Sequence, residues 1–173
     1  DTTAKFLWKM EDGALVESVL IPANQSLTGD QSDRKTLCVS SQVGCAYGCK
    51  FCASGLDGLK RNLQIHEIVG QIVAVENWAA AQNNIKRSDP IINNLVFMGM
   101  GEPLANYKNL VPALNILNAD WGMNIGARKI TISTSGLAPM IEKLAKEQQQ
   151  FRLAISLHGA TDKVRDLIMP VNK

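Results

Sequence analysis

From Thr36 onward, the sequence alternates short runs of β-forming residues with stretches of helical periodicity. This alternation is typical of βα units that build a parallel sheet. It predicts an α/β fold with four units, whose strands cover residues 36–41, 94–98, 129–133 and 151–157. Because four parallel units can neither close a barrel nor complete a full sheet, we expect residues 36–173 to be the incomplete core of a longer protein.

The four predicted helices follow from apolar periodicity and from residues that favour helix starts. The first carries an apolar stripe at the i, i+3, i+4, i+7 and i+8 positions from Ile65. The second covers residues 107–117 after the capping residue Asn106, the third opens at Pro139, and the fourth is capped by Thr161.

Residues 1–35 predict a separate extension in front of this core. Two strands, residues 5–10 and 14–21, flank an Asp12-Gly13 pair, which is a strong hairpin signal. The polar stretch 24–35 is predicted to be a loop. We therefore divide the chain into a hairpin extension, residues 1–35, and a core, residues 36–173.

Composition sets broad limits on function. With 46% apolar and 20% charged residues among 173, the chain can bury one substantial core. A net charge of +2 permits RNA as a partner without implying it. The sequence has neither an apolar run of membrane-spanning length nor a secretory pattern at its start, so we expect a cytoplasmic protein without membrane contact.

All four cysteines fall within residues 38–52, which indicates a local site and not a disulfide scaffold. Cys45, Cys49 and Cys52 have the spacing C-x3-C-x2-C on one loop. Soft thiolate ligands suit zinc or iron–sulfur chemistry. Three ligands leave one metal position open for a substrate, whereas a zinc knuckle would take Cys38 or His66 as its fourth ligand.

The predicted loops after the four strands begin near Cys45, Gly99, Ser133 and Ser156. In parallel α/β folds these loops share one functional face. Each residue type also has an ordinary structural explanation. Glu102, which follows a glycine turn, could favour a helix N-terminus; the serines could cap local backbone; His158 could be a buried imidazole.

The cysteine spacing, with the aromatic Phe51 before the last cysteine, resembles the signature of the radical-SAM superfamily. The resemblance implies a partial (β/α)6 barrel. It also implies a [4Fe-4S] cluster held by Cys45, Cys49 and Cys52, whose open iron binds S-adenosylmethionine (SAM). The run Gly99-Met100-Gly101-Glu102-Pro103 is similar to the glycine-rich SAM motif of this superfamily.

The sequence segments around these motifs resemble the RlmN/Cfr family over nearly the whole chain: residues 37–45, 98–104, 133–136 and 154–158. Members of this family methylate adenine in RNA. The resemblance implies methylation of carbon 2 in 23S rRNA and tRNA, with carbon 8 as the Cfr-type alternative. The SAM contacts that it implies are Gly101, Glu102, Ser133, Ser156, Leu157 and His158.

The same resemblance assigns Cys38 as a catalytic thiol and Glu17 as the proton acceptor. In the implied reaction, a methyl group on a second protein cysteine is activated by the 5′-deoxyadenosyl radical and added to adenine. Cys38 then releases the product by forming a disulfide with that cysteine. The methyl-carrying cysteine follows the core in the family, and no cysteine follows Cys52 here. We therefore expect that this chain alone cannot complete the reaction.

The expected partners are 23S rRNA, tRNA and an electron donor such as flavodoxin or ferredoxin, with the protein itself a monomer. Lys50, Lys60 and Arg61 beside the cysteine loop either meet RNA phosphate or are solvated loop charges. Two other functions are consistent with the cysteines: an activase that makes a glycyl radical on a partner protein, and a zinc-binding interaction module.

Overall fold

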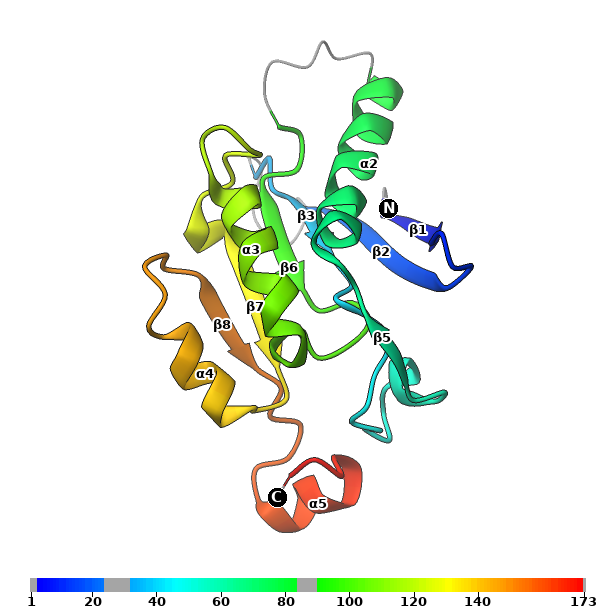
Figure 1. Ribbon diagram of the computed structural model, residues 1–173, viewed down its shortest axis with the longest axis vertical. Coiled ribbons are helices and arrows are strands. Elements are labelled where there is room, and N and C mark those ends of the chain that lie inside the picture. Colours follow the sequence, from blue (N-terminus) through cyan, green and yellow to red (C-terminus); the bar gives the residue numbers. More distant parts are fainter. Residues whose placement is uncertain (1–2, 24–31, 84–89, 173) are drawn as a thin grey trace.

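The computed structural model describes residues 3–23, 32–83 and 90–172. Its centre is a six-stranded sheet with the order β1-β2-β3-β6-β7-β8 (Figure 1). The last four strands are mutually parallel, and the first two are antiparallel to their neighbours. The strands of this sheet are β1 (Ala4–Lys9), β2 (Leu15–Pro22), β3 (Lys35–Cys38), β6 (Asn94–Phe97), β7 (Ile130–Thr134) and β8 (Arg152–Ile155).

The predicted hairpin is confirmed, and it is continuous with the core. β1 pairs with β2 from Ala4 opposite Leu20 to Lys9 opposite Leu15. β2 in turn pairs with β3, with Val19 opposite Cys38. The hairpin therefore extends the sheet of the core by two strands, while most of the predicted loop that follows it, residues 24–31, lies outside the described residues.

The four predicted βα units are also confirmed, so the fold is α/β with an incomplete barrel behind an N-terminal hairpin. Thr161 caps the last helix, accepting a hydrogen bond from the Val164 N–H, and Pro139 lies in the first turn of the third. No helix in the described ranges is long and apolar enough to cross a membrane. The helices are α2 (Ile65–Asn83), α3 (Tyr107–Asn118), α4 (Ala138–Leu144) and α5 (Asp162–Ile168).

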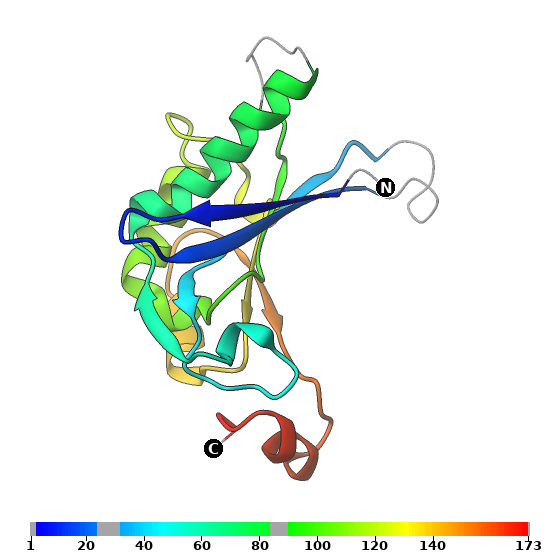
Figure 2. The ribbon, with the colours of Figure 1, turned by 90° about the vertical axis from the view of Figure 1, so that its right-hand side faces the viewer.

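Three of the helices, α2, α3 and α4, lie on one side of the sheet (Figure 2). Side chains alternate between the two faces of a strand, so in β3, β6 and β7, though not in β8, residues that face these helices are buried. Leu37, Leu95 and Ile130 are examples; all three are inaccessible to solvent and belong to one apolar cluster with α2 and α3. The opposite face is more open and presents Cys38 and Ser133.

Two features differ from the sequence prediction. Asn106 precedes α3 as predicted, but its side chain does not cap that helix. Its amide instead donates to the carbonyls of Ser41 and Leu63, at 2.8 Å each, because a short 3-10 helix, η2 (Pro103–Asn106), leads directly into α3. The side chain therefore joins distant segments where a local cap was expected.

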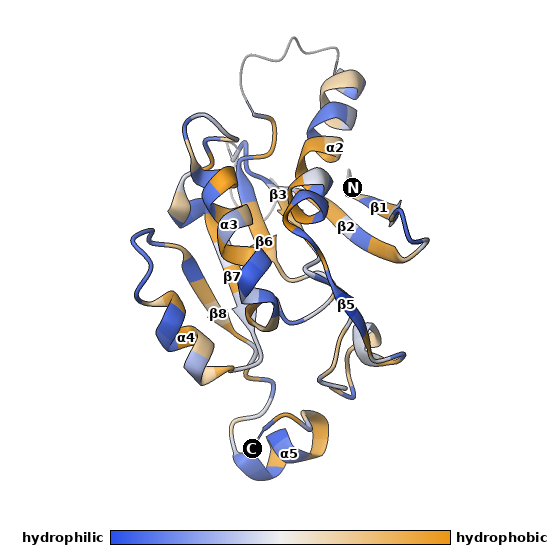
Figure 3. Cartoon of the chain, viewed as in Figure 1, coloured by the Kyte–Doolittle hydropathy of each residue, from blue (hydrophilic) through white to orange (hydrophobic). Residues whose placement is uncertain are grey.

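The second difference is a small two-stranded sheet, β4 (Gln42–Gly44) and β5 (Leu59–Asn62), which brackets the cysteine loop. Both strands are short, and β5 is polar whereas β6 is mostly apolar (Figure 3). A polar strand of four residues gives no apolar alternation, which explains why the sequence did not predict it. The remaining 3-10 helices are η1 (Ala53–Gly55) and η3 (Ala127–Lys129).

Candidate active site

A cavity of about 280 Å³ lies at the carboxyl ends of the parallel strands. Two groups of segments enclose it. We call residues 40–62 and 99–104 the cluster-side wall, and residues 133–136 and 156–159 the β8-side wall. The cavity is lined by Cys45, Tyr47, Cys49, Phe51, Cys52, Phe97, Met98, Gly99, Gly101, Glu102, Pro103, Ser133, Thr134, Ser135, Ser156, His158 and Met169.

The cysteine loop is shaped by a close approach between its two ends. The N–H of Cys45 donates to the carbonyl of Gly58 at 3.2 Å. Gly44 has a φ of 74°, and a Cβ at this position would lie 2.0 Å from the same carbonyl oxygen. Only glycine satisfies both the conformation and the space. The loop therefore leaves β4 in a direction that places its cysteines at the cavity.

The three cysteines that line the cavity are half-buried and free. Burial raises the pKa of the Cys45 thiol, with the charges of Cys52 and Glu102 adding to the effect. Burial also raises the pKa of Cys49, as do the neighbouring thiols. A bound cation reverses this cost because it stabilises thiolates directly.

No three His, Cys, Asp or Glu side chains among the described residues are grouped so as to hold a single metal ion. Cys38 and His66, the fourth ligands that a zinc knuckle would need, do not line the cavity of the three cysteines. His66 instead lines a separate cavity with Trp8 and Glu67. The geometry thus gives a four-ligand zinc site no support, whereas a polynuclear cluster takes each thiolate on a different iron and needs no such convergence.

The glycine-rich run 99–103 packs tightly against the segment that leads into the cysteine loop. The Ser41 N–H donates to the Met100 carbonyl at 2.9 Å. A Cβ on Gly99 would lie 2.8 Å from the Val39 carbonyl carbon. Gly101 has a φ of 97°, and its Cβ would meet the Gln42 side chain at 2.5 Å. The small residues therefore allow two backbone segments to run side by side at the cavity.

Glu102 is 5% exposed, and its carboxylate is held on both sides. Oε1 accepts from the Leu104 N–H at 3.2 Å, which caps η2. Oε2 accepts from the N–H and the hydroxyl of Ser135, at 2.8 and 3.0 Å. The ordinary explanation, a carboxylate at a helix start, is thus correct as far as it goes, but the same group also links the two walls. Burial, then the Glu102 charge, raises the pKa of Tyr47.

The β8-side wall presents Ser133, Ser156 and His158. The hydroxyls of Ser133, on β7, and Ser156, directly after β8, lie 3.3 Å apart. The His158 ring lies 4.2 Å from the Phe51 ring, centroid to centroid, so it touches the cluster-side wall across the cavity mouth. Leu157 is 57% exposed and, unlike its neighbours, does not line the cavity.

Cys38 and Glu17, the other two candidates from the sequence, share the open face of the sheet. Val19 is opposite Cys38, and Glu17 is two residues before Val19 on the same face. The Glu17 carboxylate pairs with the Lys5 ammonium at 2.7 Å in an exposed ion pair. Burial raises the pKa of the Cys38 thiol. Neither residue lines the cavity; both lie on the open face of the sheet.

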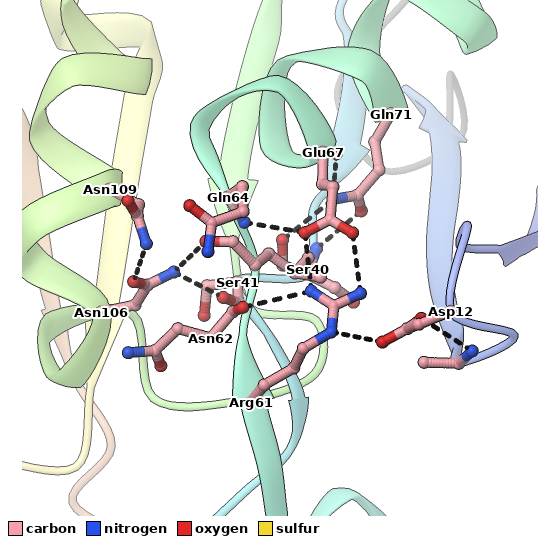
Figure 4. Close-up of polar contacts among 12 residues, drawn as sticks. Asp12, Ser40, Ser41, Arg61, Asn62, Gln64, Glu67, Gln71, Asn106 and Asn109 are labelled. Atoms are coloured by element: carbon pink, nitrogen blue, oxygen red, sulfur yellow. Dashed lines mark hydrogen bonds and ion pairs between the residues drawn. The ribbon is translucent and has the colours of Figure 1, made fainter.

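A polar network on the far side of the cysteine loop involves Arg61 (Figure 4). Its guanidinium donates to Asp12 at 2.6 Å and to both oxygens of Glu67 at 2.7 and 2.8 Å. These bonds use the donors that a phosphate would need, so Arg61 has a structural role. Lys50 and Lys60 are exposed on the same loop region.

Comparison with known proteins defines the class of this fold and site. The family model described as "Radical SAM superfamily" matches residues 39–173, which is most of the chain. The chain therefore belongs to the radical SAM superfamily. A solved radical SAM methyltransferase from Sphaerobacter thermophilus superimposes with a TM-score of 0.86 at 45% identity, covering 98% of this chain and 46% of that one.

The similar sequences narrow this class. A probable dual-specificity RNA methyltransferase RlmN of Akkermansia muciniphila is 62% identical over the whole chain, and a probable RlmN 3 of Opitutus terrae is 56% identical. In both cases the chain covers 46% of the relative. The chain thus spans about half the length of the curated relatives that it matches, and its resemblance to RlmN-type proteins extends along all of that span.

Sequence reasoning missed the residues that hold the site together. Ser135 binds Glu102, and Gln42 accepts the Glu102 N–H at 2.8 Å. Arg165 donates to three carbonyls of the β8-side wall. Gln42 and Ser135 lie within runs that resemble the RlmN/Cfr family, but neither that resemblance nor any periodicity indicates which side chain each one binds, and Arg165 lies outside those runs. Only the folded arrangement identifies them.

Proposed function

We propose that this chain is the SAM-cleaving core of a radical-SAM methyltransferase that methylates carbon 2 of adenine in 23S rRNA and tRNA. One observation carries the proposal: a single cavity gathers three free cysteines, the buried Glu102 carboxylate and the Ser133 and Ser156 hydroxyls. This proposal also rests on the printed names of the RlmN-type relatives. The complete protein's methylation, substrates and partners are part of the proposal.

The chemistry of the donors fits an iron–sulfur cluster. Cys45, Cys49 and Cys52 would hold it, and since no fourth cysteine lines the cavity within the described residues, one iron is left for a substrate. When bound and reduced, a [4Fe-4S] cluster supplies the electron that cleaves SAM. Lys50 and Lys60 are exposed, so the cysteine loop has a surface in contact with solvent. An electron donor such as flavodoxin or ferredoxin needs such a surface for docking.

The other side chains of the cavity fit SAM. Glu102 offers a buried negative charge for the ammonium of the methionyl group, beside the close backbone of Gly101. Ser133 and Ser156 offer hydroxyls, and the His158 ring with Phe51 offers an apolar and aromatic surface. Leu157, which points away from the cavity lining, would contribute through its backbone between these two residues.

Cys38 and Glu17 fit the roles of product-releasing thiol and proton acceptor because they share the open face beside the cavity. Lys5 keeps Glu17 paired with a positive charge until a substrate displaces it. In this proposal the cysteine that carries the methyl group, and that forms a disulfide with Cys38, belongs to a part of the protein beyond this sequence. The four cysteines of this chain are free.

The test uses the complete protein, reconstituted anaerobically with iron and sulfide and supplied with dithionite, SAM and a 23S rRNA fragment. We expect 5′-deoxyadenosine and 2-methyladenine. Replacing the three cavity cysteines with alanine should remove iron and both products. Cys38→Ala should keep the iron and SAM cleavage but stall the enzyme with RNA attached covalently.

Each alternative gives a different result. A glycyl-radical activase would keep working after Cys38→Ala and would ignore RNA. A Cfr-type enzyme would give 8-methyladenine. A zinc-binding interaction module would form no coloured cluster and would cleave no SAM, which would refute the proposal. We also expect a cytoplasmic protein, found in the soluble fraction after cell fractionation. Light scattering of the purified protein should show a monomer.

A further inference from the structure

Arg165, in the last turn of α5, donates hydrogen bonds to three carbonyls of the β8-side wall. Its Nη2 donates to the Ser135 carbonyl at 3.0 Å, and its Nη1 donates to the Ser156 carbonyl at 3.1 Å and to the Leu157 carbonyl. Its Nε donates to Asn172 at 2.7 Å. One half-buried guanidinium therefore joins the loops that follow β7 and β8.

The carbonyl of Leu157 has a second role in the wall. It also accepts from the Gly159 N–H at 2.6 Å, which closes a three-residue turn around His158. His158 has a φ of 51°, a left-handed conformation that side chains other than glycine rarely adopt. Such turns are strained, and the surrounding structure must hold them in place. Arg165 fixes the carbonyl on which this turn depends.

The Ser135 carbonyl connects the same guanidinium to the opposite wall. Ser135 donates both its N–H and its hydroxyl to Glu102. The chain of contacts therefore runs from Glu102 through Ser135 and Arg165 to Ser156 and Leu157. None of the three ion pairs within the described residues includes Arg165, so its charge faces carbonyl oxygens instead of a carboxylate.

We propose that Arg165 is a positioning residue for SAM: it holds Ser156 and the strained His158 turn at the spacing from Glu102 that the ligand requires. This inference rests on the proposed function, since SAM is the ligand. The planar fork of arginine reaches carbonyls on two loops at once, which a lysine ammonium on a single stem does not reproduce. Arg165 does not line the cavity. It acts on ligand affinity through the position of Ser156 and the His158 turn.

The experiment compares Arg165→Gln and Arg165→Lys with wild type in the complete, cluster-loaded protein. Arg128→Gln is the control, since exposed Arg128 bonds only to the Gln150 side chain within the described residues. We expect both Arg165 variants to raise the KM for SAM about tenfold, with kcat for SAM cleavage within about twofold, as one lost interaction of ordinary strength predicts. The control should match wild type.

A second readout needs no SAM: amide hydrogen exchange of residues 156–159 should be faster in both Arg165 variants. An unchanged KM for SAM would overturn the inference. So would a lower melting temperature that comes with an unchanged KM and unchanged exchange rates. Wild-type protein that loads its cluster but cleaves no SAM would refute the proposed function instead. In that case the exchange rates alone would decide whether Arg165 holds the turn.

Discussion

The cluster-side wall and the β8-side wall of the cavity differ in how their backbones are fixed. Behind the cluster-side wall, the buried Gln71 side chain accepts from the Ser18 hydroxyl at 2.7 Å and the Ser40 N–H at 3.0 Å, and donates to the Ser40 carbonyl. Ser40 then bridges the Glu17 carbonyl and the Met100 N–H. Each of these polar groups would be costly to leave unpaired, since Ser18, Ser40 and Gln71 are at most 2% exposed.

Residues 156–159 of the β8-side wall depend on a more accessible group, the half-buried Arg165. Arg165 belongs to a seven-residue helix that contains no buried residue. The carbonyl of Ile168 at the end of this helix accepts from the Lys50 N–H, which is the helix's link to the cysteine loop. Segments with few buried contacts open at lower free energy than core segments. One wall is therefore built into the core, while the other can adjust when a ligand enters.

The largest expected effect comes from breaking the rigid wall with Gly44→Ala. The added Cβ would lie 2.0 Å from the Gly58 carbonyl oxygen, and the φ of 74° would itself be strained. A backbone clash of this kind, with a core that cannot relax, should cost more than about 3 kcal/mol. We expect reconstituted protein to lose most of its iron, measured by iron and sulfide content and by the visible spectrum.

Gly58→Ala is the matched control, because Gly58 also has a positive φ, 67°, but open space around its Cβ position. It should cost about 1 to 2 kcal/mol for the conformation alone and keep its iron. Equal iron loss in the two variants would mean that backbone strain, and not the close approach, explains the Gly44 effect.

A smaller effect is expected from the ion-pair network that supports the rigid wall. Hydrogen bonding to Arg61 lowers the pKa of Asp12 to about 2 and also lowers the pKa of Glu67. A carboxyl whose pKa is depressed in the folded state adds stability above its unfolded pKa, near 4, and loses it as the pH falls further. The free energy of unfolding should therefore fall more steeply below about pH 4 in wild type than in Arg61→Met.

Lys60→Met controls for the change in charge. Lys60 is an exposed neighbour on β5 that takes part in none of the three ion pairs of the described residues. Urea unfolding at pH values from 6 to 3 gives the slopes directly. Parallel slopes in wild type and Arg61→Met would show that the network adds no pH-dependent stability.

The sequence predicted the fold well because its signals are local. Apolar periodicity located α2 and α3, and the Asp12-Gly13 turn located the hairpin. Strand ends were less accurate: the predicted strand 36–41 is β3, Lys35–Cys38, because Ser40 and Ser41 turn toward Gln71 and Met100. A side chain 31 residues away in the sequence, Gln71, decides that end, and no local pattern records such a bond.

For the candidate site too, residues with a local signal were predicted and long-range bonds were not. The cysteine spacing, the loops that follow the parallel strands and the family resemblance together gave eleven candidate residues. Eight of them line one cavity: Cys45, Cys49, Cys52, Gly101, Glu102, Ser133, Ser156 and His158. Motifs work here because parallel strands bring their carboxyl ends to one edge. The bonds from Ser135 and Arg165 were not predictable, since each depends on the distance between loops.

The smallest effect should come from the cap of the helix that carries Arg165. The Thr161 hydroxyl accepts from the Val164 N–H at 3.4 Å, a long bond in an exposed position. Thr161→Ala should therefore cost about 0.5 kcal/mol, the low end for loss of a cap, and raise the KM for SAM about twofold at most. Thr161→Ser, which retains the hydroxyl, should behave as wild type in the same SAM-cleavage assay.

Comparing Thr161→Ala with Arg165→Gln separates the contribution of the Arg165 side chain from that of the stability of α5. If α5 stays folded without its cap, the guanidinium still reaches Ser135, Ser156 and Leu157, and the order of residues 156–159 depends on the Arg165 side chain more than on the stability of α5. A tenfold rise in KM from Thr161→Ala would instead mean that the short helix unfolds as a unit. The β8-side wall would then be ordered by the stability of the whole α5 segment, including the Ile168 bond to the cysteine loop.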